Sequence, residues 1–514
     1  MFWSYFILVL YVLSMVGITI YTKNRSKSVN DFLLAGKNGL NGWLSAFAYG
    51  TTYFSAVIFI GYAGKFGAQY QLAAVWIGIG NAIIGSLFAW KVLAKKTKLM
   101  TTKLSAKTMP EFFEKRYGSK RLKLCAAVVI FIFLIPYSAS VYNGLSNLFE
   151  MVFNIDGWIV MIALAAITAL YLFFGGYFAT ALSDFIQGII MLIGVILMVI
   201  YFLDSPQVSW NISELNWFTS SSSGKVIYGD TVSLLSLILL TSFGVWALPQ
   251  TIHKYYAIRD DKAINQGMIV STLFALIIGF GAYFVGGLSE LFSAEIADAG
   301  VKLGSDDTIP VMMKLAIPAG LMGIIAVLIL SASMSTLSSV SLASASVVAV
   351  DIYKGKINTN ADDKKVNIIM RVLCLVFILI SVVLALLNDI FGIAAIAYMM
   401  GLSWGTLAGC FIGPYVLGLF WKKVSRSAVW TSIIGSLVLT VILTIVFGYD
   451  KVGWNCSFAA AIQGGIGSSP LTGVICMIFS IVATFVVSLF TKAPDDSIIV
   501  NAFNAAKENT VVSQ

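Results

Sequence analysis

About thirteen apolar runs of roughly 20 residues or more divide this chain, and each is long enough to cross a bilayer as a helix. They cover approximately residues 3–21, 41–69, 73–94, 124–152, 157–176, 180–203, 230–253, 266–289, 310–350, 366–388, 390–421, 427–448 and 470–491. Two runs, 41–69 and 310–350, are too long for one straight crossing, so each is expected to contain a break or a preceding short helix. The chain is 59% hydrophobic and only 11% charged, with a mean hydropathy of +0.90, which excludes a soluble domain. The sequence therefore predicts an all-α integral membrane protein.

The charged residues lie in the loops and predict how the chain is oriented. A net charge of +9 would suggest nucleic acid in a soluble protein. Here the positive-inside rule explains it, because the basic loops fall on one side of the membrane. The basic residues are Lys23, Arg25, Lys27 and Lys37, the stretch 95–123, Lys254 and Arg259, Lys354, Lys356, Lys364 and Lys365, and Lys422, Lys423 and Arg426. The opposite loops carry Glu290, Glu295, Asp298, Asp306 and Asp307. We expect the N-terminus outside, the C-terminus inside, and no nucleic-acid partner.

The ends of the chain and its rarer side chains suggest no separate activity. Run 3–21 has no basic residue before it and no small-residue cleavage site after it, so we expect a retained first helix. Residues 493–514 form a polar cytoplasmic tail to which the sequence assigns no function. The five cysteines are scattered, so no disulfide or thiolate metal site is expected. The lone His253 is expected at the inner end of its run, as a capping or interfacial residue.

The run 310–350 contains a stretch rich in hydroxyl groups, from Ser331 to Ser341. On a helix, Ser335, Ser338 and Ser339 lie at i, i+3 and i+4, on one face. That face presents oxygen atoms only, which are the ligands that a hard cation such as Na⁺ requires. The alternative is that small serine side chains simply allow two membrane helices to pack closely.

A second signal lies near the other end of the chain, where residues 49–55 read Tyr-Gly-Thr-Thr-Tyr-Phe-Ser. Glycine, serine and β-branched threonine all weaken a helix. Backbone carbonyls freed by a break in mid-membrane are tolerated only where they face protein or a water-filled cavity, and they are good Na⁺ ligands. Broken helices at the midplane are typical of secondary transporters. The alternative is an unbroken helix, since glycine is common in membrane helices.

A third signal is Asp184, which lies near the inner end of an apolar run with no further charge until Asp204. A carboxylate inside a membrane is costly and therefore indicates a function. The alternative is a residue that caps the N-terminus of its helix, a role that Asp184 or the adjacent Ser183 would fill well. Both roles are compatible.

Together these stretches resemble the sodium/solute symporter family, which includes bacterial proline, galactose, sialic acid and pantothenate symporters. The resemblance covers roughly residues 28–425. Its motifs are Asp31-Phe-Leu-Leu-Ala-Gly-Lys37, the stretch ending Phe59-Ile-Gly-Tyr-Ala-Gly64, Thr108-Met-Pro-Glu-Phe-Phe-Glu-Lys-Arg116, the piece from Gly175 to Gln187, Trp246-Ala-Leu-Pro249, and Ser335-Thr-Leu-Ser-Ser339 leading to Asp351-Ile-Tyr-Lys354. Each motif is weak alone, but their order and spacing together are specific.

The resemblance implies a fold and two ion sites. The fold would be a LeuT-type inverted repeat of five plus five helices over about 41–421, with one extra helix before it and two after, in a single transmembrane domain, 1–492. The main sodium site would use the carbonyls of Thr51, Phe54 and Ala332 and the hydroxyls of Ser335 and Thr336. The second sodium site, as in the sialic acid symporters, would use Asp184, Ser335, Ser338 and Ser339.

The identity of the solute is less constrained. Proline symporters carry an Asp where this chain has Tyr53, and the Arg that sialic acid symporters use is missing from the matching segment, 124–152. The candidate cavity residues are Thr52, Tyr53, Ser55, Tyr142, Trp246 and Tyr398. Because the positions that match the sugar-binding residues are apolar or small, a polyol would leave hydroxyl groups unpaired, at roughly 1–3 kcal/mol each. The set favours a small, partly apolar solute: an amino acid, a short carboxylate or a vitamin-like acid.

The leading hypothesis is therefore a sodium-coupled symporter that imports a small organic solute by alternating access. A sodium-coupled sugar or polyol symporter and a sodium-responsive sensor or channel-like protein on the same fold remain as alternatives. No nucleophile–base constellation suggests an enzyme, and Na⁺ is the only cofactor expected. We expect a multi-pass protein of the cell membrane, the bacterial plasma membrane, in contact with lipid and with a small-molecule substrate, and monomeric.

Overall fold

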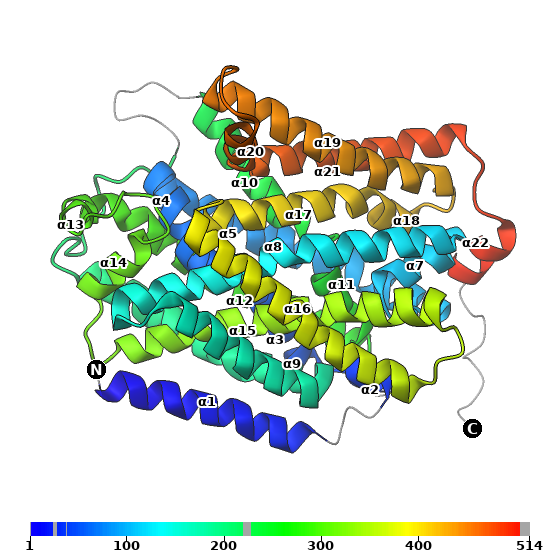
Figure 1. Ribbon diagram of the computed structural model, residues 1–514, viewed down its shortest axis with the longest axis horizontal. Coiled ribbons are helices and arrows are strands. Elements are labelled where there is room, and N and C mark those ends of the chain that lie inside the picture. The colour runs from blue at the N-terminus through cyan, green and yellow to red at the C-terminus, as the bar shows by residue number, and fades with distance from the viewer. Residues whose placement is uncertain (1, 24–27, 37–38, 219–227, 504–514) are drawn as a thin grey trace.

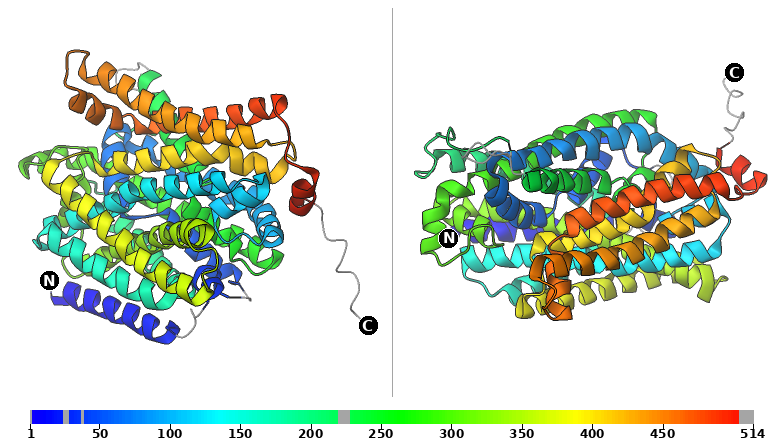
Figure 2. Two further views of the ribbon diagram at one scale, coloured as in Figure 1. Left: turned by 45° about the vertical axis from the view of Figure 1, so that its right-hand side comes forward. Right: turned by 90° about the horizontal axis from the view of Figure 1, so that it is seen from above.

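The fold is a bundle of long helices that run roughly along the longest axis of the molecule (Figure 1). The computed structural model describes residues 2–23, 28–36, 39–218 and 228–503, and within these ranges the only β-type pairing is an isolated bridge between Leu40 and Ile258. The first helix covers one side of the bundle, and the orange pair α19 and α21 covers the opposite side (Figures 1 and 2).

The first half of the chain supplies eleven α-helices, from α1 to α11. They are α1 (Phe2–Thr22), α2 (Val29–Leu34), α3 (Gly42–Tyr53), α4 (Ala63–Tyr70), α5 (Val75–Gly80), α6 (Lys95–Leu104), α7 (Met109–Tyr117), α8 (Lys120–Phe153), α9 (Gly157–Asp204), α10 (Tyr228–Gly244) and α11 (Pro249–Tyr256). Three π-helical segments and one 3₁₀ turn continue several of these helices: Val57–Tyr62, Gln71–Ala74, Asn81–Phe88 and Trp90–Ala94.

The second half of the chain is also made of α-helices that shorter helical segments continue. Its helices are α12 (Asp261–Gly287), α13 (Ser293–Asp298), α14 (Thr308–Ala316), α15 (Met322–Ser346), α16 (Asp363–Phe391), α17 (Ile396–Ile412), α18 (Gly418–Phe420), α19 (Arg426–Val452), α20 (Phe458–Ile466), α21 (Ser469–Phe490) and α22 (Asp496–Phe503). A 3₁₀ turn, Leu288–Phe292, and π-helical segments at Val347–Ile357 and Gly413–Leu417 continue α12, α15 and α17. Side chains cap the first turns of many helices, as Asn41, Thr108, Ser119, Asp260, Asp362 and Ser425 do.

Among the described residues, eleven continuous helical ranges are long and apolar enough to cross a membrane. Two of them are 48 residues long, about twice the length that one crossing needs. One, α9, turns at Gly176, whose φ of 61° and ψ of −161° are open essentially to glycine alone. The other, Val57–Leu104, turns at Gln71, where φ is 52°. With each of these counted twice, the thirteen crossings expected from the sequence are present.

Two transmembrane helices are interrupted in the middle of the bundle. Helix α3 ends at Tyr53, Phe54 is extended (φ −107°, ψ 107°), and a π-helical segment begins at Val57. This is the break predicted for residues 49–55. A second break separates α10 from α11, and Pro249 begins the new helix because a missing N–H is harmless at that position. The sequence reasoning missed the second break, which Leu248-Pro249 signals.

The long run 310–350 resolves as expected into a short helix, α14, followed by the crossing helix α15. Within residues 493–503, α22 forms and packs on the bundle, with the ring of Phe503 4.8 Å from the Arg116 guanidinium. Residues 504–514 of the predicted tail lie outside the described residues.

The two ends of the bundle differ in charge, as the orientation argument requires. The acidic residues Glu290, Glu295, Asp298, Asp306 and Asp307 lie on or beside α13 and α14, at the end that carries the N-terminus (Figure 1). The basic helices α6 and α7 and the Lys422 loop lie at the end that carries α22. Arg25, Lys27 and Lys37, which the prediction also used, lie outside the described residues.

The prediction that Lys254 lies in a basic loop is wrong. It belongs to α11, and only 2% of its surface is exposed.

Candidate functional site

The break after α3 faces the serine-rich helix α15. Because α3 ends at Tyr53, the carbonyl oxygen of Thr51 lies free to accept hydrogen bonds from the hydroxyls of Ser335 (3.0 Å) and Thr336 (3.4 Å). The Ser335 hydroxyl also lies 3.1 Å from the carbonyl oxygen of Ala332. Four of the five residues predicted for the main sodium site are thus in mutual contact, and all are fully buried.

This cluster contains neutral oxygen atoms and no charged side chain. Phe54, the fifth predicted ligand, is the extended residue of the break, and within the described ranges its carbonyl accepts no hydrogen bond from the hydroxyls of the cluster. A cage of carbonyl and hydroxyl oxygens suits a hard monovalent cation held weakly enough to be released. The Ser335 hydroxyl therefore makes a polar contact between α15 and the break after α3, and α15 is also almost wholly buried.

The second predicted set lies beside the first and is connected to it. Ser338 donates to the carbonyl of Ser335 (2.9 Å), and the Ser339 hydroxyl lies 2.8 Å from that of Thr52. Asp184 is fully buried, and neither of its carboxylate oxygens has a hydrogen-bond partner in the part of the chain that the structure describes. A buried carboxylate is strongly unfavourable without a cation, and the Lys254 ammonium lies 3.8 Å from Oδ2 of Asp184.

Asp184 does not cap a helix. Helix α9 runs from Gly157 to Asp204, and its kink at Gly176 lies about two turns before Asp184. The capping alternative raised by the sequence therefore does not fit, and the electrostatic role of Asp184 is the one that its position supports. His253 is also more buried than expected: its ring packs edge-on against Tyr177, with centroids 5.2 Å apart.

The predicted solute residues divide into a central group and an outer one. Tyr53 lies at the break, stacks on Phe54 with centroids 4.6 Å apart, and donates its hydroxyl to the Thr241 carbonyl on α10 (2.8 Å). Thr52 contacts Ser339, and the Ser55 hydroxyl accepts the Val57 N–H (3.3 Å). These three residues are buried at the centre of the molecule.

Two aromatic residues that the sequence reasoning missed complete the central group. The Trp404 ring lies 6.1 Å from Tyr53 and 5.6 Å from Tyr137. The indole N–H of Trp404 and the hydroxyls of Tyr137 and Tyr142 are buried, and none has a hydrogen-bond partner within the described ranges. Buried polar groups of this kind require a partner, which a polar solute can supply. Nothing in the local sequence distinguishes them from packing aromatics.

Of the two remaining predicted residues, only Tyr398 lies away from this centre. Trp246 belongs to the second break and donates its indole N–H to the Ile84 carbonyl (3.0 Å). Tyr398 lies towards the end that carries the N-terminus, with the Lys65 ammonium 4.7 Å and the Lys451 ammonium 5.8 Å from its ring centroid. Tyr398 and Tyr53 therefore lie at different depths along the bundle.

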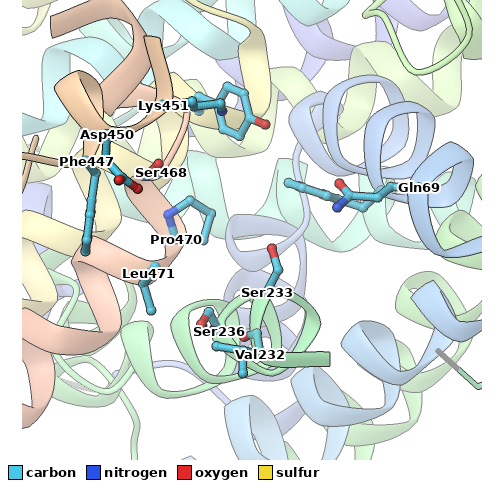
Figure 3. Close-up of a pocket in the computed structure, with 13 residues that line it drawn as sticks. Gln69, Val232, Ser233, Ser236, Phe447, Asp450, Lys451, Ser468, Pro470 and Leu471 are labelled. Atoms are coloured by element: carbon cyan, nitrogen blue, oxygen red, sulfur yellow. Dashed lines mark hydrogen bonds between the residues drawn. The ribbon is translucent and has the colours of Figure 1, made fainter. Parts of the chain in front are cut away.

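Tyr398 borders two cavities. One, of about 430 Å³, lies between α4, α10 and the α19–α21 pair, and Gln69, Ser233 and Lys451 line it (Figure 3). The other, of about 490 Å³, shares Gln69 and Tyr398 and adds Lys65, Lys302 and Asp306. Asp306 accepts the N–H of Ile396 at the first residue of α17 (3.0 Å), and burial raises the pKa of its carboxyl group. We refer to the two cavities together as the outer mouth.

A bundle with two helices broken at mid-depth, and an oxygen cluster where one break meets a serine-rich helix, defines a secondary transporter. The chain belongs to the sodium:solute symporter family, whose model matches residues 32–435. It is 27% identical to the osmoregulated proline transporter OpuE of Bacillus subtilis, with 94% of each chain covered. It is also 27% identical to the sodium/pantothenate symporter of Haemophilus influenzae, with 85% of this chain and 89% of the relative covered.

Solved structures agree on the fold. A Na⁺-coupled sialic acid symporter superposes with a TM-score of 0.73 at 18% identity, covering 96% of this chain and 99% of the other. A transporter of the nucleobase-cation-symport-1 family superposes with a TM-score of 0.51 at 13% identity, covering 93% and 98%. The LeuT-type architecture expected from the sequence is therefore confirmed, and the chain is a sodium-coupled symporter of small organic solutes.

Proposed function

We propose that this symporter imports a small solute that carries a carboxylate, such as an amino acid, a short carboxylate or a vitamin-like acid, together with Na⁺. One observation supports it above all: the Thr51 carbonyl, freed by the break, meets the hydroxyls of Ser335 and Thr336 at the level of Tyr53. An ion bound there would lie next to a solute in the break. Each would then be bound more tightly when the other is present, which is the physical basis of coupling.

The main sodium site would consist of Thr51, Phe54, Ala332, Ser335 and Thr336. The hydrogen bonds that now join these residues would be replaced, and their oxygen atoms would coordinate Na⁺ directly. Asp184, Ser335, Ser338 and Ser339 would form a second cation-binding set. Neither set involves an organic cofactor, and we propose no chemical conversion of the solute.

The solute would bind in the central group of Thr52, Tyr53, Ser55 and Tyr142, with Tyr137 and Trp404. Its aromatic walls suit the apolar part of a small solute, and the unpaired donors of Tyr137, Tyr142 and Trp404 suit a carboxylate. Tyr398 would contact the solute earlier, on its way to the centre, and Trp246 would line the second break.

The outer mouth favours a carboxylate over a polyol. Lys65, Lys302 and Lys451 line it, two of them beside the Tyr398 ring, whereas its carboxylates are Asp306 and Asp450. Ammonium groups around a cavity raise the local concentration of anionic groups. We propose that the mouth faces the exterior, with the N-terminus outside, the C-terminus in the cytoplasm, and the protein acting as a monomer.

The test is uptake by proteoliposomes of a solute panel containing amino acids, short carboxylates, pantothenate-like acids and polyols, with and without an inward Na⁺ gradient. We expect a carboxylate-bearing solute to accumulate only with Na⁺, and to raise the melting temperature only when Na⁺ is present. Accumulation of a polyol alone would refute the proposed solute class. Uptake that is independent of Na⁺ would refute the proposed ion site.

A further inference from the structure

Lys254 is a buried cation that lies within the second cation-binding set. Its ammonium nitrogen donates to the Ser339 hydroxyl (2.8 Å) and lies 3.8 Å from Oδ2 of Asp184. It also lies 5.0 Å from the centroid of the Tyr177 ring. The ammonium therefore reaches two of the four residues that the resemblance assigns to a second Na⁺.

The ion pair satisfies the electrostatic requirement of Asp184. The side chains of Lys254 and Asp184 are 2% and 0% exposed, so neither charge is solvated by water. Each would be strongly unfavourable alone, and together they are balanced. A Na⁺ ion added between Asp184 and Ser339 would lie within a few ångströms of the ammonium, and like charges at that separation repel strongly in a poorly solvated site.

The contacts of Lys254 also join several helices. It belongs to α11, which follows the second break, whereas Thr52 belongs to α3, which precedes the first. The Ser339 hydroxyl contacts both Lys254 and Thr52 (2.8 Å each), and Asp184 belongs to α9. An ammonium at this place does what a bound metal cation would do: it draws oxygen atoms from several helices towards one positive charge.

We propose that the Lys254 ammonium is a built-in second cation, which fills the set of Asp184 and Ser339 permanently and leaves one Na⁺ per transport cycle. This rests on the proposed main sodium site. Lys254 would thus determine how many Na⁺ ions are moved in each transport cycle. The ammonium stays attached to the chain through the cycle, so it contributes no transported charge.

The test is to count bound ²²Na⁺ on purified full-length protein at equilibrium, which requires no knowledge of the solute. We expect one ion per wild-type protein and a Hill coefficient of one. Lys254→Gln removes the charge but keeps hydrogen-bonding groups, so Asp184 should then hold a second Na⁺. The count and the Hill coefficient should rise towards two, and the charge moved per neutral solute should double.

Two further variants separate this effect from a general disturbance of the protein. Lys254→Arg keeps the charge and should keep the count at one. Lys254→Gln combined with Asp184→Asn lacks both charges and should return the count from two to one. In each variant, unchanged affinity at the main site shows that the protein is folded.

A wild-type count of two would overturn the inference without touching the proposed symport, and this measurement involves no variant that has to fold. A folded Lys254→Gln protein that still binds a single ion would overturn it as well. A wild-type protein that binds no Na⁺ would instead overturn the proposed function, and the inference with it.

Discussion

At the scale of single residues, the serine hydroxyls of α15 differ in their hydrogen-bond acceptors although they are similarly buried. Ser335 donates across to the Thr51 carbonyl, whereas Ser333, two residues earlier, donates to the Ile329 carbonyl of its own helix. The two hydroxyls are therefore a matched pair, one at the proposed ion site and one away from it.

Ser335→Ala should raise the Na⁺ concentration needed for half-maximal uptake by about fivefold, because losing one oxygen partner is worth roughly 1 kcal/mol. The measurement is solute uptake as a function of Na⁺ in proteoliposomes. Ser333→Ala is the control and should leave the Na⁺ dependence unchanged. If both variants behave like wild type, Ser335 is not a ligand.

Tyr53 offers a second residue-scale prediction. Its hydroxyl joins the first break to Thr241 on α10, and a Cβ atom on Gly85 would lie 2.1 Å from that hydroxyl oxygen. Tyr53→Phe removes the bond, and Gly85→Ala should displace the same ring. Both should weaken solute binding by about fivefold, the effect of losing about 1 kcal/mol, while changing Na⁺ affinity less.

Solute-dependent thermal stabilisation at saturating Na⁺ measures the effect on solute binding. Na⁺ titration without solute measures the effect on Na⁺ affinity. Tyr449→Phe, whose ring stacks on Trp454 far from the break, is the control. Equal losses of Na⁺ and solute affinity would show that the break itself has collapsed.

The residue-scale prediction from the sequence succeeded where periodicity carries the information. The i, i+3, i+4 spacing placed Ser335, Ser338 and Ser339 on one face without knowledge of the fold. It failed for Lys254, because a lysine at the end of an apolar run reads as a loop residue on hydropathy alone. Its partner Asp184 lies 70 positions away, and no local pattern connects them.

At the scale of elements, the break in the first core helix was predictable because glycine and threonine weaken a helix locally. The break between α10 and α11 was not predicted, since apolar residues continue through it and only Pro249 signals it. The bend in α9 was anticipated as a gap between two runs. In the structure it is one continuous helical range that turns at Gly176.

Gly176→Ala tests that bend. A Cβ at φ 61° and ψ −161° is strained by roughly 1–3 kcal/mol, so the variant should melt about 1–3 °C below wild type in detergent. Gly17→Ala, in a helical position with no atom within 4 Å of the added Cβ, should melt at or above the wild-type temperature. An unchanged melting temperature for Gly176→Ala would mean that the bend is not a fixed feature.

At the scale of the whole molecule, the two ends can be assigned to the two sides of the membrane with a native cysteine. Cys456 lies between α19 and α20, at the end that carries the N-terminus, and is half-buried (Figure 1). Cys374, Cys410 and Cys476 are buried in the bundle. The proposed orientation therefore places Cys456 outside.

A membrane-impermeant maleimide added to intact cells should label the wild-type protein, and Cys456→Ser should abolish the labelling. Because Cys125 is also half-buried, the orientation would be reversed only by labelling that appears after permeabilisation in the wild type and is lost in Cys456→Ser. The sequence predicted the separation of charge between the ends because loop composition is local. Which aromatic rings meet at the centre depends on packing between distant helices, so Trp404 and Tyr137 could not be predicted.

The Lys254–Asp184 pair also limits how far this protein could concentrate its solute. A membrane potential of about 100 mV and a roughly tenfold Na⁺ gradient supply about 3.7 kcal/mol for each ion that enters. One ion per cycle then sustains at most about a 500-fold ratio of a neutral solute across the membrane, whereas two ions would sustain the square of that ratio. A lysine fixed in the second set thus exchanges accumulating power for a smaller sodium demand.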